Sequence, residues 1–527
     1  MFFPYRRFRI DHRRLAAVAC RSAPARVFGA VTYALMLLVV LAPLFRGGYV
    51  PWATLTLQMA SVTLFLMAIW QRHPVRLRVT EIGFLALLFV IPALYLTPLP
   101  GWLTVVSLPG RTLYQEALAL LDTTQTGLQR LSVAPPLTEA SWWMLVVPIG
   151  VYVAVRTLSE AARVRVIYAF FAIVLAQVLI ALFQFAANMG ADYAVADLLN
   201  RSGSSGTYVN RNHLAGMIEL ALPLALALFV YNFGSRFKGQ RRTAGLRERV
   251  LAVLKSGNRP SLIFILLVMF FTVGVVVTRS RSGIALAMVG ILLTAIFFSR
   301  RIGGRGTFGL VGQLVAISLG VAVFLGLAPV LDRFSVASLE GDARWEIATA
   351  TFNAAGSLLP FGSGPGTFAD VFVLYQPLPL GRWFINYAHN DYLQAMFEMG
   401  LPGLGLIGLF LVLYLAHWPR LLTADEWSRY RSLQVGAGIA MLLLLLHSFS
   451  DNNLRNPANM AYFAMVAAIY FAPPGMPRPQ DRARVRKRRT ATLAESGLSS
   501  LPVPASAAPA QASDARPTQR PRNPFDD

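Results

Sequence analysis

The residues best suited to chemistry lie within residues 342–406, a polar, aromatic and glycine-rich stretch in an otherwise apolar chain. The stretch contains three short motifs: Arg344-Trp345, the turn sequence Gly-Ser-Gly-Pro-Gly at 362–366, and His389-Asn390-Asp391. An imidazole titrates near neutral pH, so His389 can either accept a proton or orient a hydroxyl group by hydrogen bonding. We expect any chemistry of this protein to take place here.

Arginines at the ends of apolar runs are the second set of candidates. Arg279 and Arg281 lie in a tight hairpin between two apolar runs, and Arg211 opens another run. Arg344 is a further such position. The planar guanidinium group binds phosphate oxygens in a bidentate manner, so paired arginines suit a diphosphate. The alternative is that these side chains extend to lipid headgroups. Several arginines and one histidine from separate loops favour a binding site.

The composition is typical of a membrane protein. The chain has 527 residues, of which 55% are hydrophobic and 14% are charged, and its mean hydropathy is +0.53. A soluble domain carries about 25% charged residues. Cys20 is the single cysteine, which excludes an intramolecular disulfide and a cysteine-based metal site.

Apolar runs of about 20 residues predict transmembrane helices. The sequence has twelve such runs, at 28–45, 51–70, 80–97, 142–156, 165–187, 212–232, 260–278, 282–299, 307–330, 398–416, 432–449 and 457–472. We therefore predict an all-α polytopic membrane protein with about twelve transmembrane helices.

Charged residues predict the orientation of these helices. Every second loop is rich in Arg or Lys, which places those loops and both termini in the cytoplasm. The pattern also accounts for the net charge of +23, so nucleic acid is not expected as a partner. Three regions follow: a basic cytoplasmic N-terminus at 1–27, a transmembrane domain at 28–473, and a disordered basic cytoplasmic tail at 474–527. A large outside loop, residues 331–397, joins the ninth and tenth spans.

Within that loop we predict a helix from about Ala343 to Ser357, with Asp342 as its cap. The glycine motif at 362–366 lacks the lysine and the following helix of a phosphate loop, so we interpret it as a turn that aims the loop. A second short helix is expected near 114–121. The sequence contains no Walker A motif and no zinc-binding pattern, and we expect neither a metal nor a cofactor.

The sequence resembles the O-antigen ligase and O-antigen polymerase family of bacterial inner-membrane glycosyltransferases. The resemblance covers roughly residues 200–470 and depends on the order and spacing of several motifs. These are Asn210–Gly216, Ser280–Gly283, Arg344-Trp345, Gly362–Phe368, His389–Leu393 with Glu398–Gly403, and His447–Leu454 with Pro457–Asn459.

The resemblance implies a multi-pass protein of the bacterial inner membrane, surrounded by membrane lipids. It implies that loop 331–397 is periplasmic and roofs the site. The implied reaction transfers a glycan from an undecaprenyl-diphosphate carrier to an acceptor hydroxyl, without a metal. By motif match, His389 and Arg281 are the catalytic residues. Arg211, Arg279 and Arg344 would bind the diphosphate, with Asn390, Asp391 and Trp345 in support.

The acceptor is open at this stage. A ligase uses lipid A-core, whereas a polymerase of the same family uses a second lipid-linked glycan. A transporter without catalysis is a third reading, because twelve spans alone permit it. Transporters tend to place polar sites at mid-membrane. The polar residues of this chain gather at the outer edge, which favours an enzyme.

Overall fold

Apolar runs form helices in a membrane because a helix satisfies all its backbone hydrogen bonds internally. The structure is a computed structural model, and it describes residues 29–70, 77–100, 128–189, 204–236, 259–299, 320, 339–381, 383–423 and 427–473. The chain divides into two units, Met1–Pro474 and Gly475–Asp527, and all described residues lie in the first. The predictions for residues 1–27, 114–121 and 474–527, and for the span at 307–330 apart from residue 320, lie outside the described residues.

Within the described residues, eight helices are long and apolar enough to cross a membrane, which is consistent with an all-α polytopic membrane protein. They are α2 (Pro51–Ile69), the pair α6 (Pro135–Met144) and α7 (Val146–Thr157), α8 (Glu160–Met189), α10 (Arg211–Arg236), α12 (Arg259–Val277), α13 (Arg281–Ser299), α18 (Asp391–Leu422) and α19 (Arg429–His447). Shorter apolar helices are Gly29–Leu41, α3 (Val79–Leu94) and α20 (Pro457–Tyr470). Each predicted span within the described residues overlaps one of these helices; the total of twelve stays a prediction.

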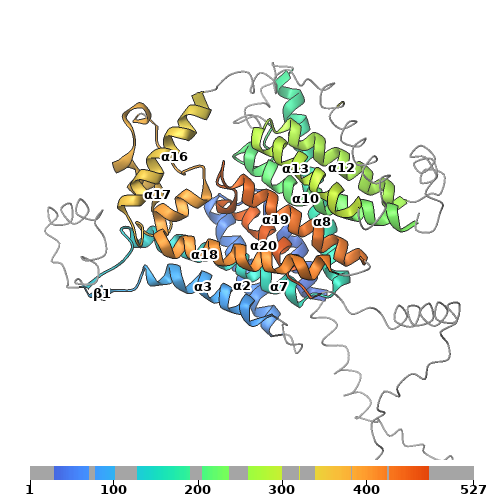
Figure 1. Ribbon diagram of the computed structural model, residues 1–527, viewed down its shortest axis with the longest axis horizontal. Coiled ribbons are helices and arrows are strands. Elements are labelled where there is room, and N and C mark those ends of the chain that lie inside the picture. Colours follow the sequence, from blue (N-terminus) through green and yellow to red (C-terminus); the bar gives the residue numbers. More distant parts are fainter. Residues whose placement is uncertain are drawn as a thin grey trace, which may run out of the picture. The chain divides into compact units, whose positions relative to one another are not determined.

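Helix α10 lies at the centre of the helical bundle. It packs against α8, α12, α13, α19 and α20, and 94% of its apolar window is buried (Figure 1). Small residues allow this close packing, because a Cβ atom added at Gly436 of α19 would lie 2.9 Å from Cβ of Ala227. Since α10 is surrounded by other helices, its first residue, Arg211, has a fixed position at the end of the bundle.

Helix α18 begins earlier than predicted. It begins at Asp391, inside the predicted loop 331–397, because the Asn390 side chain accepts hydrogen bonds from the backbone N–H groups of Tyr392 and Leu393. The backbone at Gly400 departs from helical geometry, with φ of 56°, and Pro402 follows. This kink separates the first turns of α18 from the apolar part, which is why hydropathy placed the span at 398–416.

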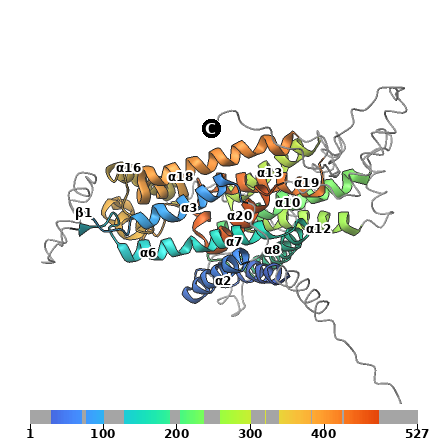
Figure 2. The same ribbon diagram turned by 90° about the horizontal axis from the view of Figure 1, so that it is seen from below.

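The predicted loop folds into a small module beside those first turns. It consists of α16 (Leu339–Ser357), α17 (Phe368–Phe372), η2 (Val373–Tyr375) and η3 (Leu378–Leu380). Phe368, Phe372 and Phe397 form its core, with the Phe368 and Phe397 ring centroids 5.1 Å apart. Figures 1 and 2 show α16 and α17 next to α18, with which both make contacts. The predicted cap was wrong: α16 begins at Leu339, so Asp342 lies in its first turn.

The glycine motif is a turn, as predicted. Gly362, Gly364 and Gly366 all have positive φ, which residues with a side chain rarely adopt. The backbone N–H of Ser363 donates to the carbonyl oxygen of Phe397 at 3.0 Å, and that of Gly364 donates to Glu398 at 2.8 Å. The turn therefore fastens the module to the first part of α18. The only strands among the described residues, β1 (Leu99–Pro100) and β2 (Leu128–Gln129), form one short antiparallel pair.

Candidate functional site

A cavity of about 470 Å³ lies where α10, α13, α16 and α18 begin. Seven of the eight residues proposed from the sequence line it: Arg211, Arg279, Arg281, Arg344, Trp345, His389 and Asn390. The sequence analysis did not assign its other lining residues to the site: Asn212, Ser282, Ala348, Leu393, Phe449 and Ser450. The cavity is therefore built from segments that are up to about half of the chain apart in sequence.

Two helix starts form the arginine side of the cavity. Arg211 is the first residue of α10 and Arg281 is the first residue of α13. A Cβ atom added at Gly283 would lie 2.7 Å from Cβ of Ala215, so these two helices touch within their first turns. The N-terminal end of a helix carries partial positive charge, which adds to the charge of the guanidinium groups. This side of the cavity suits an anion.

Arg279 precedes α13 in an unusual backbone conformation. Its φ is 55°, in the left-handed region that few residues other than glycine occupy. Its guanidinium carbon lies 5.0 Å from the centroid of the Phe185 ring, within cation–π distance. The ring of α8 thus supports one side of this arginine while the residue lines the cavity.

His389 also has a left-handed backbone, with φ of 51°. Its side chain is 30% exposed, and Nδ1 lies 3.1 Å from Oδ1 of Asp451. The next residue, Asn390, caps α18, and the Asp391 backbone N–H donates to the carbonyl oxygen of Ser448 at 2.8 Å. These local bonds hold the imidazole at the cavity wall.

Asp451 joins the segments around the cavity, and the sequence analysis did not assign it to the site. Its carboxylate is fully buried and lies 3.6 Å from Nη2 of Arg344. The side-chain amide of Asn210 donates to Oδ2 at 3.2 Å, and the amide of Asn212 donates to the same oxygen. We call Asp451, His389, Arg344, Asn210 and Asn212 the Asp451 cluster.

The charge of Asp451 follows from these partners. Burial raises the pKa of the carboxyl, but the hydrogen bond with His389 and the positive charges nearby, Arg344 included, outweigh it. The pKa of Asp451 is therefore held well below its usual range. A buried aspartate that stays ionised can hold an imidazole in one tautomer and one orientation. The sequence signals for this role are an acidic residue between two apolar runs and its place in the His447–Leu454 motif.

Arg344 connects the α16 module to the cavity. Its Nη1 donates to the carbonyl oxygen of Ser450 at 3.2 Å, and its side chain remains 35% exposed. The Ser450 hydroxyl in turn donates to the Ser282 hydroxyl of α13 at 2.8 Å. The neighbouring Trp345 is 76% exposed and lines the same cavity.

Asp391 is the predicted site residue that does not line the cavity. Its carboxylate is buried, accepts the backbone N–H of Leu454 at 3.1 Å, and lies 3.8 Å from Nε of Arg455. Arg455 also pairs with Glu398, at 2.9 Å between Nη2 and Oε2. Asp391 thus holds the start of α18 against the segment after α19, which supports the cavity only indirectly.

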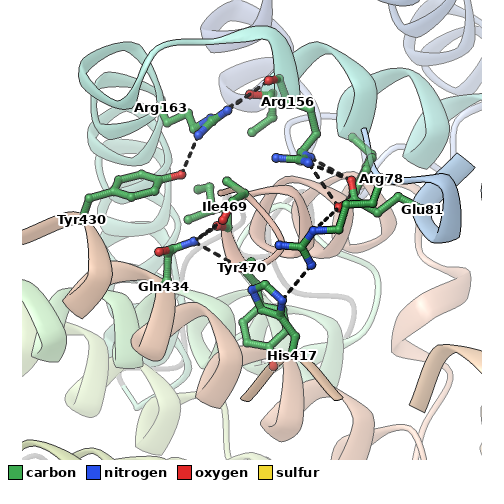
Figure 3. Close-up of polar contacts among 12 residues, drawn as sticks. Arg78, Glu81, Arg156, Arg163, His417, Tyr430, Gln434, Ile469 and Tyr470 are labelled. Atoms are coloured by element: carbon green, nitrogen blue, oxygen red, sulfur yellow. Dashed lines mark hydrogen bonds and ion pairs between the residues drawn. The ribbon is translucent and has the colours of Figure 1, made fainter. Parts of the chain in front are cut away.

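A second charged cluster involves other helices (Figure 3). Arg156 of α7 donates to the Glu81 carboxylate of α3 at 2.8 Å, and Tyr152 donates to it at 3.1 Å. Arg78 lies 3.8 Å from Glu81 and 3.1 Å from Nδ1 of His417. We call these five residues the Glu81 cluster. None of them lines the cavity that contains His389.

The cavity can bind an anion and move a proton. Four arginines and one histidine line it, and the described lining residues include no carboxylate. Guanidinium groups bind phosphate oxygens, and a histidine held by a carboxylate is suited to general base catalysis. Among the described residues, no group of three or more His, Cys, Asp or Glu is placed to hold a metal ion.

Comparison with known proteins identifies the same part of the chain. A family model described as O-antigen ligase matches residues 264–408. The match includes Arg279, Arg281, Arg344 and His389, and it ends before Asp451. No curated protein matches the sequence. The resemblance inferred from the motifs is confirmed by the family model.

Proposed function

We propose a specific reaction for this protein, supported by the match of residues 264–408 to the O-antigen ligase family model. The protein transfers a glycan from an undecaprenyl-diphosphate carrier to an acceptor hydroxyl. It acts at the periplasmic face of the bacterial inner membrane and needs no metal. Lipid A-core is the acceptor in this proposal.

The observation that carries the proposal is the cavity lined by four arginines and one histidine. When the bond between the glycan and its carrier breaks, negative charge develops on the diphosphate. Preorganised cations at that position stabilise the transition state more than the ground state. In this proposal Arg281, the first residue of α13, takes this role, and Arg211, Arg279 and Arg344 line the same cavity.

His389 supplies the base in this mechanism. With Nδ1 held by Asp451, Nε2 is the nitrogen that can accept the proton of the acceptor hydroxyl. The hydroxyl oxygen attacks the anomeric carbon, the bond to the diphosphate breaks, and undecaprenyl diphosphate leaves. Asp451 stabilises the imidazolium that forms. A single displacement inverts the configuration at the anomeric carbon.

The test uses the purified full-length protein in detergent with an undecaprenyl-diphosphate-linked glycan and EDTA. Lipid A-core and a second lipid-linked glycan are offered in parallel. A shift of lipid A-core supports the ligase, and a ladder of lipid-linked glycan indicates a polymerase instead. No transfer to either, with donor supply verified, would favour a transporter. Loss of transfer only in EDTA would contradict metal independence.

Variants locate the activity at the cavity. We expect His389→Ala to lower the transfer rate by about 10²–10⁴-fold, the usual contribution of a general base. Arg429→Ala is the matched control, because Arg429 is exposed at the start of α19 and does not line the cavity. Retained transfer by both His389→Ala and Arg281→Ala would overturn the mechanism.

A further inference from the structure

A second cavity adjoins the site and shares Trp345 with it. It has a volume of about 620 Å³, and one face of α16 forms one of its walls. Tyr375 and Pro377, from the segment of η2 and η3, also line it. We call this cavity the α16 groove. Its volume falls within the range of about 300–1,000 Å³ that is usual for small-molecule sites.

The helical wall of the groove presents polar side chains. Glu346, Thr349 and Asn353 follow one another at spacings that place them on the same face of α16. Thr349 and Asn353 are exposed. Within the part of the chain that the structure describes, the side chains of these three residues have no hydrogen-bond partner. A carboxylate, a hydroxyl and an amide are therefore available to a ligand.

Aromatic rings complete the groove. The Trp345 side chain is 76% exposed, and the Tyr375 ring is fixed edge-on against Phe397 with centroids 6.2 Å apart. The Gln376 side-chain amide donates to the carbonyl oxygen of Trp383 at 2.7 Å, which holds the segment after η2 in place. An aromatic ring accepts the apolar face of a sugar, while polar side chains bind its hydroxyl groups.

The charge of the groove differs from that of the neighbouring site. Among the residues that the structure describes, one carboxylate, Glu346, and no lysine or arginine line the groove, whereas four arginines line the cavity with His389. A phosphorylated or acidic sugar would be repelled by Glu346 and would find no cation among the described lining residues. A neutral sugar or an amino sugar fits this lining.

We infer that the α16 groove binds neutral or amino sugars of the glycan chain, next to the site of transfer. The inference rests on the proposed function, and it adds the class of sugar and the residues that receive it. Because Trp345 lines both cavities, a glycan with its reacting end near His389 extends along α16 into the groove.

The first test measures binding without transfer. Saturation-transfer NMR is recorded on the full-length protein in detergent with a neutral N-acetylhexosamine trisaccharide or with a uronic acid trisaccharide. Asn353→Trp fills the groove, and Phe352→Trp is its matched control, because Phe352 is exposed on α16 and lines neither cavity. We expect Asn353→Trp to weaken binding of the neutral trisaccharide at least about tenfold, a change of about 1.4 kcal/mol.

Two results of the NMR test would overturn the inference. One is equal binding of the neutral trisaccharide by the wild type and by Asn353→Trp. The other is equal binding of the uronic acid and the neutral trisaccharides by the wild type. Both results are measured by binding alone, even when the wild type transfers no glycan. A failure of the inference can therefore be distinguished from a failure of the proposed function.

The second test identifies which substrate contributes the sugars. Transfer is measured with donors that carry one sugar or several sugars. A higher KM of Asn353→Trp for the longer donor alone assigns the groove to the donor glycan. A higher KM for the acceptor assigns the groove to the acceptor. An active Asn353→Trp variant with neither KM changed would overturn the inference.

Discussion

The Asp451 cluster and the Glu81 cluster each contain a buried carboxylate, an arginine and a histidine, but we expect them to have different consequences. In the Glu81 cluster, the Arg156 side chain is 1% exposed, and its guanidinium group contacts both carboxylate oxygens (Figure 3). In the Asp451 cluster, the Arg344 side chain is 35% exposed, and the contact with the carboxylate is longer, at 3.6 Å. One arginine is enclosed by protein, and the other faces a cavity.

Further hydrogen bonds surround the Glu81 cluster. Nη1 of Arg163 donates to the Tyr430 hydroxyl at 2.9 Å, and its Nη2 donates to the carbonyl oxygen of Arg156 at 3.0 Å. The Gln434 amide donates to the carbonyl oxygens of Ile469 and Tyr470 at 3.1 and 3.2 Å. These bonds satisfy buried polar groups near helix ends. They join α7, α8, α19 and α20, and the Arg156–Glu81 pair joins α7 to α3.

The difference shows that the number of arginines does not identify a site. Removing one partner of a buried, closely spaced ion pair lowers the free energy of unfolding strongly, because the other charge stays buried without a partner. An arginine that lines a cavity can exchange water for the oxygens of an anion. We therefore expect changes in the Glu81 cluster to affect stability, and changes at the cavity to affect transfer.

The largest effect is expected for Arg281→Ala. Removing one preorganised cation from the developing charge should lower the transfer rate by about 10³-fold, while the melting temperature stays close to that of the wild type. Arg281→Lys keeps the charge and loses the planar guanidinium group, so its transfer rate should lie between those of the wild type and Arg281→Ala. The measurements are initial rates with saturating acceptor and thermal unfolding in detergent. An unchanged rate for Arg281→Ala would remove this residue from the mechanism.

A smaller loss of rate is expected for Asp451→Asn. His389 would lose the carboxylate that orients it and stabilises its imidazolium, so the rate should fall by about 10²-fold. Asp370→Asn is the control, because Asp370 is an exposed aspartate of α17 that does not line the cavity. Initial rates of both variants, normalised to folded protein, provide the comparison. Equal rates for the two variants would contradict the role of Asp451.

Glu81→Gln should change stability and leave the rate intact. Breaking this buried pair leaves Arg156 without its carboxylate, which typically costs about 3–5 kcal/mol in the free energy of unfolding. Glu139→Gln, at an exposed position of α6, is the matched control. Thermal unfolding and the rate per folded molecule at low temperature are measured together. A reduced rate without a loss of stability would show that the Glu81 cluster takes part in transfer.

The smallest effect concerns the pH dependence of stability. Since the pKa of Asp451 is lowered in the folded protein, its ionised form stabilises the fold above the unfolded pKa of about 3.9. This contribution is lost as the pH falls through the lower folded pKa. The stability advantage of the wild type over Asp451→Asn should therefore be full at about pH 5 and shrink below about pH 4. An advantage that grows on acidification below pH 4 would contradict the assigned charge.

The sequence predicted most of the helices because hydropathy is a local property. Apolar runs located each of the long apolar helices within the described residues, but the start of α18 and the start of α16 were wrong. At α18, the capping bonds of Asn390 extend the helix over polar residues that hydropathy cannot assign to a span. At α16, the helix begins at Leu339. Asp342, although a residue type that favours the N-cap position, therefore lies within the helix.

Part of the site was predicted as well, because some of its residues lie in local sequence motifs. Arg281, Arg344 and His389 were recognised because each lies in a local motif, and the fold brings them to one cavity. Asp391 was predicted as a supporting residue because it belongs to the His389-Asn390-Asp391 motif, and Asp451 was not assigned to the site. The left-handed backbone of His389 and the cap at Asn390 leave Asp391 buried near Arg455.

The sequence by itself determined the membrane-protein class, the positions of the apolar helices and the types of residue available for chemistry, because these follow from composition and local spacing. Only the tertiary structure decided which aspartate holds His389, since that partner lies 62 residues away along the chain. It also decided that four arginines from three separate segments share a cavity while Arg156 is enclosed. Close packing of helices fixes these contacts, and the pairing depends on distances that no local pattern encodes.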